Sequence, residues 1–274
     1  LGSAPDPEAA EETVHYALLN HPAPRSLLLI GGGFNGSLVE ALKHPTVERV
    51  DYVELDPAVI QLTRTYLPGT LPQDPRVRIH LEDGRVFLRN TAVCFDVIVV
   101  SLPDPYTAQI NRFYTVEFFR LVRRRLAEGG VFSFRLSASE NYISPALAAF
   151  LGAMRRSLGE VFSDVTLLPG ASVHFFASDA SGRLARNAQQ LIARLQERRL
   201  ETTYVREYFI PFRMSQDRMQ RLEESLNSQG RASLNRDFAP AAYYYGSVLW
   251  SSRFSPSSSF WLERLGRVPW GVLM

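Results

Sequence analysis

The stretch from Ser26 to Gly36 reads Ser-Leu-Leu-Leu-Ile-Gly-Gly-Gly-Phe-Asn-Gly, and it decides the fold. Residues 26–30 form a short apolar run of the kind that builds a buried strand. The glycines that follow fit the pattern Gly-x-Gly-x-x-Gly, which lets the backbone turn tightly and lets a ligand approach it. These glycines are Gly31, Gly32, Gly33 and Gly36. The stretch predicts a strand, a turn and a helix, although such turns are common and alone are weak support for a ligand.

Strands and helices alternate after this stretch. We expect strands at Val50–Glu54, Val77–Leu81, Phe95–Ser101 and Val131–Leu136. We expect helices near Ser37–Lys43, Pro57–Tyr66, Asp83–Arg89, Tyr114–Leu126 and Pro145–Leu158. Gly129 and Gly130 are expected to end the fourth of these helices. Strands joined by helical crossovers form a parallel sheet. A turn containing Pro169 and Gly170 predicts a hairpin from the apolar runs Val165–Leu168 and Val173–Ala177.

The predicted fold class is α/β, a Rossmann-like doubly wound sheet of the S-adenosylmethionine-dependent methyltransferase type. It comprises five parallel strands, a C-terminal antiparallel hairpin and a mostly helical C-terminal extension. We divide the chain into a short N-terminal segment (1–24), a nucleoside-binding domain (25–179), an α+β extension (180–254), and a linker with a terminal amphipathic or membrane-proximal segment (255–274). Within the extension, Tyr204–Phe212 is expected to be a strand.

Composition argues against several classes of protein. Hydrophobic residues make up 46% of the chain and charged residues 21%, as in ordinary folded domains. Thirty basic residues stand against 28 acidic ones with no dense basic block, so nucleic acid is not an expected partner. The five histidines have no metal-ligand spacing, so no metal is expected. The single cysteine, Cys94, fits a reducing compartment and is expected to be buried.

Acidic residues follow the second and third predicted strands. Glu54 lies at the carboxyl end of the second strand, where a carboxylate can accept both ribose hydroxyls of a nucleoside. Asp83, followed by Gly84, closes the third strand and can accept a hydrogen bond from an adenine amino group. The structural alternatives are a solvated acid for Glu54 and a helix cap for Asp83. Together the two acids favour an adenosine ligand.

The fourth strand leads into Ser101-Leu102-Pro103-Asp104-Pro105. The crevice of an open α/β sheet lies outside this strand end, so a group that reacts with a bound cofactor should meet this loop. Asp104 stands between two prolines that restrict its backbone. Its carboxylate can orient a cationic amine or remove a proton from it. A rigid Pro-Asp turn is the alternative.

These motifs resemble those of the spermidine/spermine synthase (aminopropyltransferase) family across about residues 8 to 180. The resemblance rests on Leu28-Leu29-Ile30-Gly31-Gly32-Gly33, Lys43-His44-Pro45, Val53-Glu54-Leu55-Asp56, Asp83-Gly84, Phe95-Asp96-Val97-Ile98 and Asp104-Pro105. It implies a transferase that uses decarboxylated S-adenosylmethionine, or S-adenosylmethionine, and transfers an aminopropyl group to a small-molecule amine, with methylthioadenosine as product. It places Glu54 at the ribose and Asp83 at the adenine. The expected catalytic residues are Asp104, Ser101 and Tyr114, and the expected substrate contacts are Gln109, Asn111, His15 and Tyr16.

Two positions depart from the family pattern. The family's glycine loop usually continues with an acidic residue, where this chain has Phe34. Its fourth strand usually ends Asp-Ser-Ser-Asp-Pro, and the first of those aspartates, the family's base for the attacking amine, is Ser101 here. A hydroxyl neither carries the negative charge nor accepts a proton at neutral pH. Two carboxylates expected near a polycationic substrate are therefore absent.

The chain most resembles a divergent bacterial branch in which a synthase-like domain is attached to a multi-span membrane protein. Asn235-Arg236-Asp237-Phe238 and Tyr243-Tyr244-Tyr245 carry this likeness. In that interpretation Trp261–Met274 approaches a membrane segment, and the alternative is an amphipathic helix packed on the domain. We expect a cytoplasmic location, at the membrane face if that segment exists, and we consider a homodimer.

Three functions remain open. The first is aminopropyl transfer, or another alkyl transfer from an adenosylsulfonium to an amine. The second is methyl transfer, which would require a cationic or polar partner near the glycine loop for the methionine carboxylate. The third is a domain that senses the nucleoside without turnover. The family resemblance supports the first function, aminopropyl transfer. The neutral residues Phe34 and Ser101 argue against it.

Overall fold

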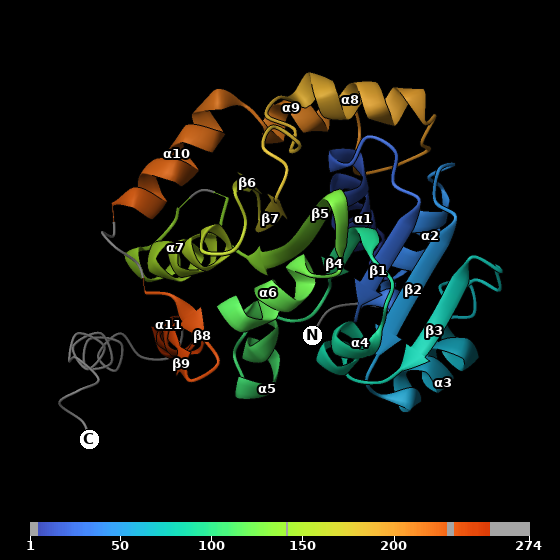
Figure 1. Ribbon diagram of the computed structural model, residues 1–274. Helices are drawn as coiled ribbons and strands as arrows, with labels where there is room; N and C mark the ends of the chain where they lie inside the picture. The colour runs from blue at the N-terminus through green and yellow to red at the C-terminus, as the bar shows by residue number, and fades with distance from the viewer. Residues whose placement is uncertain (1–4, 141, 229–232, 253–274) are drawn as a thin grey trace.

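The computed structural model describes residues 5–140, 142–228 and 233–252. Seven strands form one sheet in the order β3-β2-β1-β4-β5-β7-β6 (Figure 1). They are β1 (Ser26–Ile30), β2 (Arg49–Glu54), β3 (Val77–Leu81), β4 (Phe95–Val100), β5 (Leu126–Ser137), β6 (Asp164–Leu168) and β7 (Ser172–Ser178). The first five run parallel, and β7 pairs antiparallel with both β5 and β6. The predicted fold class is confirmed.

Helices cover both faces of the sheet because successive strand residues point to opposite sides. Leu27 and Leu29 join one apolar core with α1 (Pro7–Asn20), α2 (Ser37–Leu42), α8 (Ala188–Glu197) and α9 (Phe209–Arg213). Leu28 and Ile30 join the other core with α4 (Gly84–Asn90), α6 (Val116–Arg123), α7 (Pro145–Gly159), α10 (Gln216–Asn227) and α11 (Ala241–Ser252). The remaining helical segments are η1 (Gly33–Asn35), α3 (Pro57–Tyr66), α5 (Ala108–Asn111) and η2 (Arg112–Tyr114). A strand that is buried on both faces, such as β1, is therefore apolar along nearly its whole length.

Two expectations about backbone elements are wrong. The helix expected to run to Leu126 ends at Arg123, and Gly129 and Gly130 lie inside β5. Gly129 has a φ of 68°, and the register against β4 shifts between Phe95 and Val97, so the glycines accommodate an irregularity within the strand. Tyr204–Phe212 is not a strand, because turns lead from Tyr204 into α9.

Cys94 was expected to be buried, but it is exposed.

The C-terminal extension is attached to α1 by polar contacts. The Glu11 carboxylate on α1 is 3% exposed and accepts four hydrogen bonds from the backbone N–H groups of Thr203, Tyr204 and Val205. These N–H groups are therefore satisfied without a neighbouring strand, which explains the missing strand at this place. Arg198 after α8 donates to the carbonyl oxygens of Leu18, His21 and Pro22 at the end of α1.

A second contact attaches residues 235–237 to the loops near the edge of the sheet. The buried Asn235 amide donates to Asn111 Oδ1 at 3.0 Å and to the carbonyl oxygen of Tyr114 at 2.9 Å. Asp237 accepts two hydrogen bonds from Arg85 and one from Thr115. The motif that sequence analysis singled out at Asn235-Arg236-Asp237 thus fixes the loop that follows β4.

The Asp237 contact predicts a pH-dependent stability. Burial by itself raises the pKa of Asp237, but hydrogen bonds from Arg85 and Thr115 outweigh it and lower that pKa. A lowered folded-state pKa stabilises the fold above the unfolded-state value of about 4, and this contribution is lost as the pH falls through the lower folded-state pKa. We expect Asp237→Asn to lower the melting temperature at pH 7, with a difference from wild type that shrinks toward pH 3. Thermal unfolding between pH 7 and 3 measures this.

The control for this prediction is Asp217→Asn, which removes an exposed i,i+4 partner of Arg221. We expect a much smaller change there, because exposed ion pairs contribute little. A difference between Asp237→Asn and wild type that is constant over the pH range would contradict the assignment.

No helix among the described residues is both long enough and apolar enough to cross a membrane. The prediction for Trp261–Met274 lies outside the described residues.

Candidate nucleoside and acceptor site

The predicted ligand residues lie at the carboxyl ends of four neighbouring strands. The glycine loop follows β1, Glu54 ends β2, Asp83 follows β3 and Asp104 follows β4. Because β3, β2, β1 and β4 are consecutive parallel strands, these segments share one edge of the sheet (Figure 1). Ligands of open α/β sheets bind at this edge.

The glycine loop packs tightly on the end of β4. Gly31 and Gly32 have φ values of 73° and 69°, in the left-handed region that favours glycine. A Cβ on Gly31 would lie 2.6 Å from Leu102 Cδ2, and one on Gly32 would lie 2.2 Å from Ser101 Oγ. These two glycines are therefore required by the protein's own packing, whether or not a ligand also approaches them.

Glu54 is held in place by Tyr52. The Tyr52 hydroxyl donates to Glu54 Oε2 at 2.9 Å, and the Asp56 N–H donates to Oε1 at 3.1 Å. The Tyr52 ring also lies 2.5 Å from where a Cβ on Gly33 would be, so it connects Glu54 with the glycine loop. Burial, followed by the nearby Glu54 charge, raises the pKa of Tyr52, which therefore remains a hydrogen-bond donor at neutral pH.

Sequence analysis missed Tyr52. The available signal was its position two residues before Glu54, because residues i and i+2 of a strand lie on the same face. A hydroxyl two places from a strand-end carboxylate can reach it without leaving the sheet.

We expect Tyr52→Phe to weaken nucleoside affinity by about three- to ten-fold, the usual net effect of one hydrogen bond. The aromatic ring stays against Gly33, so the fold should be kept, while Glu54 loses one of its two positioning donors. Calorimetric titration with methylthioadenosine measures the affinity. In a Glu54→Ala background, Tyr52→Phe should not lower the nucleoside affinity further. If it lowers the affinity there as much as in the wild type, Tyr52 does not act through Glu54.

Asp83 both caps α4 and leaves one oxygen for another partner. Its Oδ1 accepts hydrogen bonds from the N–H groups of Arg85 and Val86 and from the Arg112 guanidinium at 2.8 Å. Oδ2 accepts no hydrogen bond from the residues that the structure describes. The cap and the ligand contact considered in the sequence analysis are therefore compatible. Gly84 is enclosed, since a Cβ there would lie 2.7 Å from Ile30 Cγ2.

Asp104 is fixed through both carboxylate oxygens. Oδ1 accepts from the N–H of Ser137 at the end of β5 at 3.0 Å, and Oδ2 accepts from the Tyr106 hydroxyl at 2.9 Å. Tyr106 in turn lies against α11, because a Cβ on Gly246 would be 3.0 Å from Tyr106 Cδ1. The loop after β4, the end of β5 and the C-terminal helix thus position one carboxylate.

Tyr114 supports the loop and is not exposed at the edge. Its side chain is fully buried, and its hydroxyl lies 3.1 Å from the carbonyl oxygens of Leu102 and Pro103, to which it donates. Burial, and then the charge of Asp104, raise its pKa, so it stays protonated at neutral pH. The geometry favours a positioning role for Tyr114 over proton transfer.

The predicted substrate contacts are dispersed. Gln109 is exposed, whereas Asn111 is buried and bonded to Asn235. His15 is buried in α1, where its ring nitrogens contact His44 Nε2 at 2.9 Å and Glu40 Oε2 at 3.0 Å. Tyr16 is buried as well, with the Arg213 guanidinium 5.4 Å from its ring centre. The structure gives Asn111, His15 and Tyr16 packing partners of their own.

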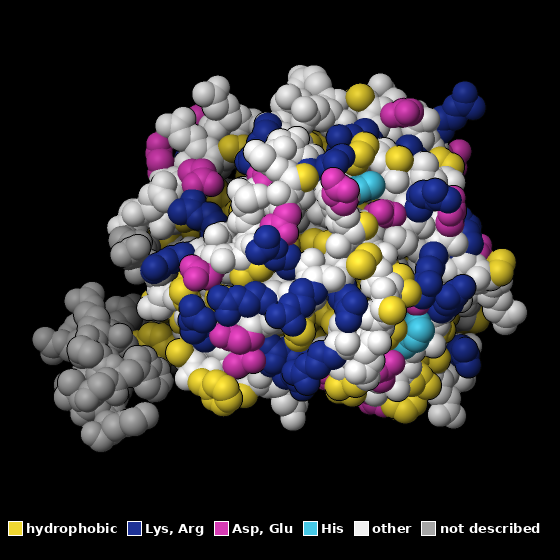
Figure 2. All heavy atoms as spheres, viewed as in Figure 1, with side chains coloured by type: hydrophobic (Ala, Val, Ile, Leu, Met, Phe, Trp, Pro, Cys, Tyr) yellow, Lys and Arg dark blue, Asp and Glu magenta, His cyan; other side chains and the backbone are white. Residues whose placement is uncertain are grey.

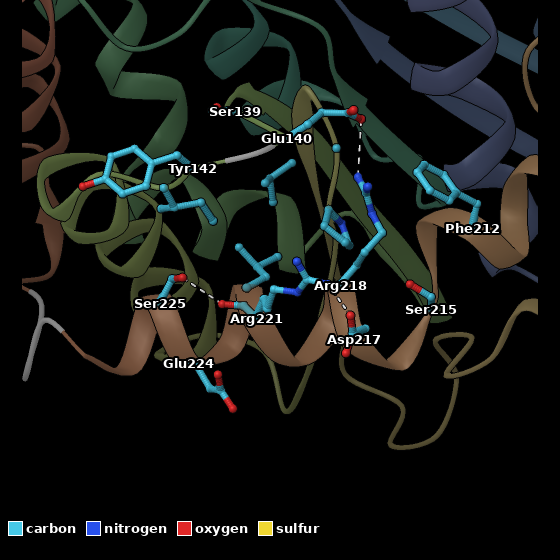
Figure 3. A pocket seen from close by; sticks show the side chains of 15 residues that line it. Ser139, Glu140, Tyr142, Phe212, Ser215, Asp217, Arg218, Arg221, Glu224 and Ser225 are labelled. Atoms are coloured by element: carbon cyan, nitrogen blue, oxygen red, sulfur yellow. Dashed lines mark hydrogen bonds and ion pairs between the residues drawn. The ribbon is translucent and has the colours of Figure 1, made fainter.

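A cavity of about 590 Å³ lies beyond β5, next to the loop that follows that strand. Figure 3 shows Arg218 of α10 pointing toward Glu140 on that loop. Arg218 Nη2 lies 3.3 Å from Glu140 Oε1. Phe212 lies beneath the Arg218 guanidinium, with 4.5 Å from Cζ to the ring centre. None of the four strand-end segments described above lines this cavity.

Basic side chains gather on the face seen in Figure 2. Two arginines near the ends of β5 and α6 have structural partners: Arg125 donates to the carbonyl oxygens of Leu88 and Arg89, and Arg123 Nε lies 2.5 Å from Asp179 Oδ2. Among the described residues no group of three or more His, Cys, Asp or Glu side chains could hold a metal ion.

The sheet order and the elements at its carboxyl edge define the class: a Rossmann-like α/β protein of the methyltransferase type. Residues 8–167 match the spermine/spermidine synthase domain. The chain belongs to this family, as its motifs predicted. The attachment to a membrane protein stays a prediction.

Curated relatives share part of their length with this chain. The polyamine aminopropyltransferase of Nitrosomonas europaea is 38% identical over 192 residues, covering 68% of this chain and 58% of the relative. The enzyme of the same name from Pyrobaculum calidifontis is 42% identical over 129 residues, 44% of each chain. The match thus spans about half the length of these relatives.

Solved structures show the same architecture. A spermidine synthase in complex with the transition-state analogue AdoDATO has a TM-score of 0.67 at 26% identity, covering 81% of this chain and 75% of that one. Human methyltransferase-like protein 13 in complex with SAH has a TM-score of 0.57 at 21% identity, covering 74% of this chain and 99% of that one. At that identity the second likeness concerns the fold alone.

Proposed function

We propose that this chain transfers an aminopropyl or related alkyl group from an adenosylsulfonium nucleoside to a small-molecule amine. The observation that carries the proposal is the placement of Glu54, Asp83 and Asp104 on one edge, around a glycine loop. The names of the relatives, polyamine aminopropyltransferases, support the same chemistry.

The residues at this edge fit an adenosine group. Glu54 presents a carboxylate whose two oxygens each have one donor, which leaves acceptor capacity for ribose hydroxyls. Asp83 Oδ2 is suited to accept a hydrogen bond from an adenine amino group. Between them, Gly31, Gly32 and Gly33 have no side chains, so the backbone of the loop can come close to a ligand.

The sulfonium supplies an activated carbon, so that a new C–N bond forms as the C–S bond breaks and the amine loses one proton. Holding the amine in line with that carbon contributes most of the rate. Asp104 is the carboxylate placed to accept a hydrogen bond from the amine and then its proton. The N–H of Ser137 and the hydroxyl of Tyr106 keep Asp104 in one orientation.

Ser101 has a packing role next to this carboxylate. Its side chain lies against Gly32 and its N–H donates to the carbonyl oxygen of Ile30. We therefore assign the proton transfer to Asp104 alone and Ser101 to the shape of the loop. With Ser101 and Phe34 both neutral, this site should attract a polycation less strongly than one with two further carboxylates.

The test is calorimetric titration with methylthioadenosine, S-adenosylmethionine and decarboxylated S-adenosylmethionine, followed by an assay of methylthioadenosine release with putrescine. We expect Glu54→Ala to weaken each nucleoside about 10- to 100-fold, since a charge-assisted hydrogen bond contributes about 1.5–3 kcal/mol. Glu48→Ala is the matched control, because Glu48 precedes the opposite end of β2 and pairs with Arg25 on the surface. Equal affinities for wild type and Glu54→Ala would remove Glu54 from the site.

A further inference from the structure

Arg135 lies beside Ser101 at the carboxyl edge of the sheet. Phe134 of β5 pairs with Val100 of β4, so continuing the parallel register by one residue brings Arg135 next to Ser101. Phe134 belongs to the core that contains α7, so Arg135, one residue later, points to the opposite face, which α1 covers. There it lines a cavity of about 150 Å³ together with Glu12 of α1 and Ser172 of β7.

The Arg135 guanidinium is partly buried and forms no hydrogen bond or ion pair with any described residue. The acidic side chains around this cavity either have other hydrogen-bond or ion-pair partners or are exposed to solvent. Glu12 binds Arg213 and His174, Glu140 pairs with Arg218, and Asp6 caps α1 by accepting from the N–H of Ala9. Glu8 is exposed to solvent.

The charge of Arg135 nevertheless acts on its surroundings. Burial by itself raises the pKa of Glu12, but His174, Arg213 and Arg135 together outweigh it and lower that pKa. Arg135 attracts Glu12 electrostatically, but its guanidinium N–H groups have no hydrogen-bond acceptor among the described residues. These N–H groups are therefore able to donate to an acceptor on a ligand at this edge.

The positions near Arg135 where the family usually has acidic residues are neutral in this chain. Ser101 next to Arg135 is neutral, and so is Phe34 in the glycine loop. The charged side chains at the ends of β4 and β5 are therefore Asp104, Arg135 and, on the loop after β5, Glu140, which is paired with Arg218. Asp104 and Arg135 are the carboxylate and the guanidinium without a charged side-chain partner among the described residues. This pair complements a ligand that carries both an ammonium and a carboxylate better than it complements a diamine.

We propose that Arg135 binds a carboxylate of the ligand at this edge. This inference rests on the proposed function, and it names the ligand class as one that carries a carboxylate beside its amine. The carboxylate has two sources: the methionine group of an intact S-adenosylmethionine, or the amine acceptor itself.

The first experiment compares nucleosides that differ by this one group. Wild-type protein is titrated with S-adenosylmethionine and with its decarboxylated form. If the cofactor supplies the carboxylate, we expect about a ten-fold preference for S-adenosylmethionine, and loss of that preference in Arg135→Gln. Methylthioadenosine, which lacks the amino acid group, should bind both proteins equally.

The second experiment tests the acceptor in the same way. With methylthioadenosine bound, the protein is titrated with ornithine and with putrescine, which differ by a carboxylate. A preference for ornithine that Arg135→Gln removes and Arg135→Lys keeps would assign the carboxylate to the acceptor. Arg78→Gln is the control, because it removes the same charge from an exposed position on β3.

Equal or weaker binding of the carboxylate-bearing member in both pairs would overturn the inference, and this comparison needs only wild-type protein. If Arg78→Gln removes the preference for the carboxylate-bearing ligand as fully as Arg135→Gln does, the effect is one of overall charge, and the inference is also overturned. Failure of methylthioadenosine to bind wild-type protein would instead overturn the proposed function. The two failures are therefore distinguishable.

Discussion

Asp104→Asn is expected to lower the release of methylthioadenosine in the amine assay at least 100-fold, while nucleoside affinity stays within about two-fold of wild type. A positioned general base typically contributes between about 10² and 10⁴ in rate. The amide keeps an oxygen for the N–H of Ser137, and its NH₂ group can donate to the Tyr106 oxygen. The loop should therefore keep its shape and lose only the proton acceptor.

Asp179→Asn is the matched control for Asp104→Asn, because Asp179 is an exposed partner of Arg123 away from this edge. It should retain full activity. If Asp104→Asn instead loses nucleoside binding together with turnover, Asp104 has a structural role and the acid–base assignment fails.

Gly32→Ala is expected to lower the free energy of unfolding by about 2–5 kcal/mol. The left-handed backbone contributes about 1–2 kcal/mol for a residue with a Cβ. Overpacking contributes typically about 1–3 kcal/mol more. Here the new methyl group would stand 2.2 Å from Ser101 Oγ and 2.9 Å from the Ser101 carbonyl oxygen. Urea unfolding at neutral pH measures the change.

Gly159→Ala is the control for Gly32→Ala. Gly159 is the last residue of α7, and a Cβ there would meet nothing within 4 Å. We expect it to be neutral or to stabilise the fold by up to about 1 kcal/mol. Ser101→Gly in the Gly32→Ala background should recover part of the loss, because one of the two clashing groups is a side chain. Wild-type stability for Gly32→Ala would contradict the tight packing described here.

The sheet and the positions of its strand-end acids were predictable because both depend on local patterns. Mostly apolar runs of five or six residues define the buried strands β1 and β4, and Asp83 also caps the helix after its strand. Parallel strands end on one edge, so Glu54, Asp83 and Asp104 were expected to come together.

Contacts between distant parts of the chain were not predictable in this way. Asn235 binds Asn111 across more than 120 residues, and nothing in the local pattern of either segment indicates the other. The buried positions of His15 and Tyr16 likewise depend on partners such as His44 and Arg213. His15 and Tyr16 were placed at the substrate by the family resemblance, which gives no information about these partners.

The hydrogen bonds of the Glu11 carboxylate extend beyond the region that matches the family model. The family match ends at residue 167, yet Glu11, near its beginning, accepts hydrogen bonds from the backbone N–H groups of residues 203–205. A fragment trimmed to the matched region would lose these donors and expose the Glu11 carboxylate to solvent. The region that matches the family model is therefore shorter than the region that these hydrogen bonds connect.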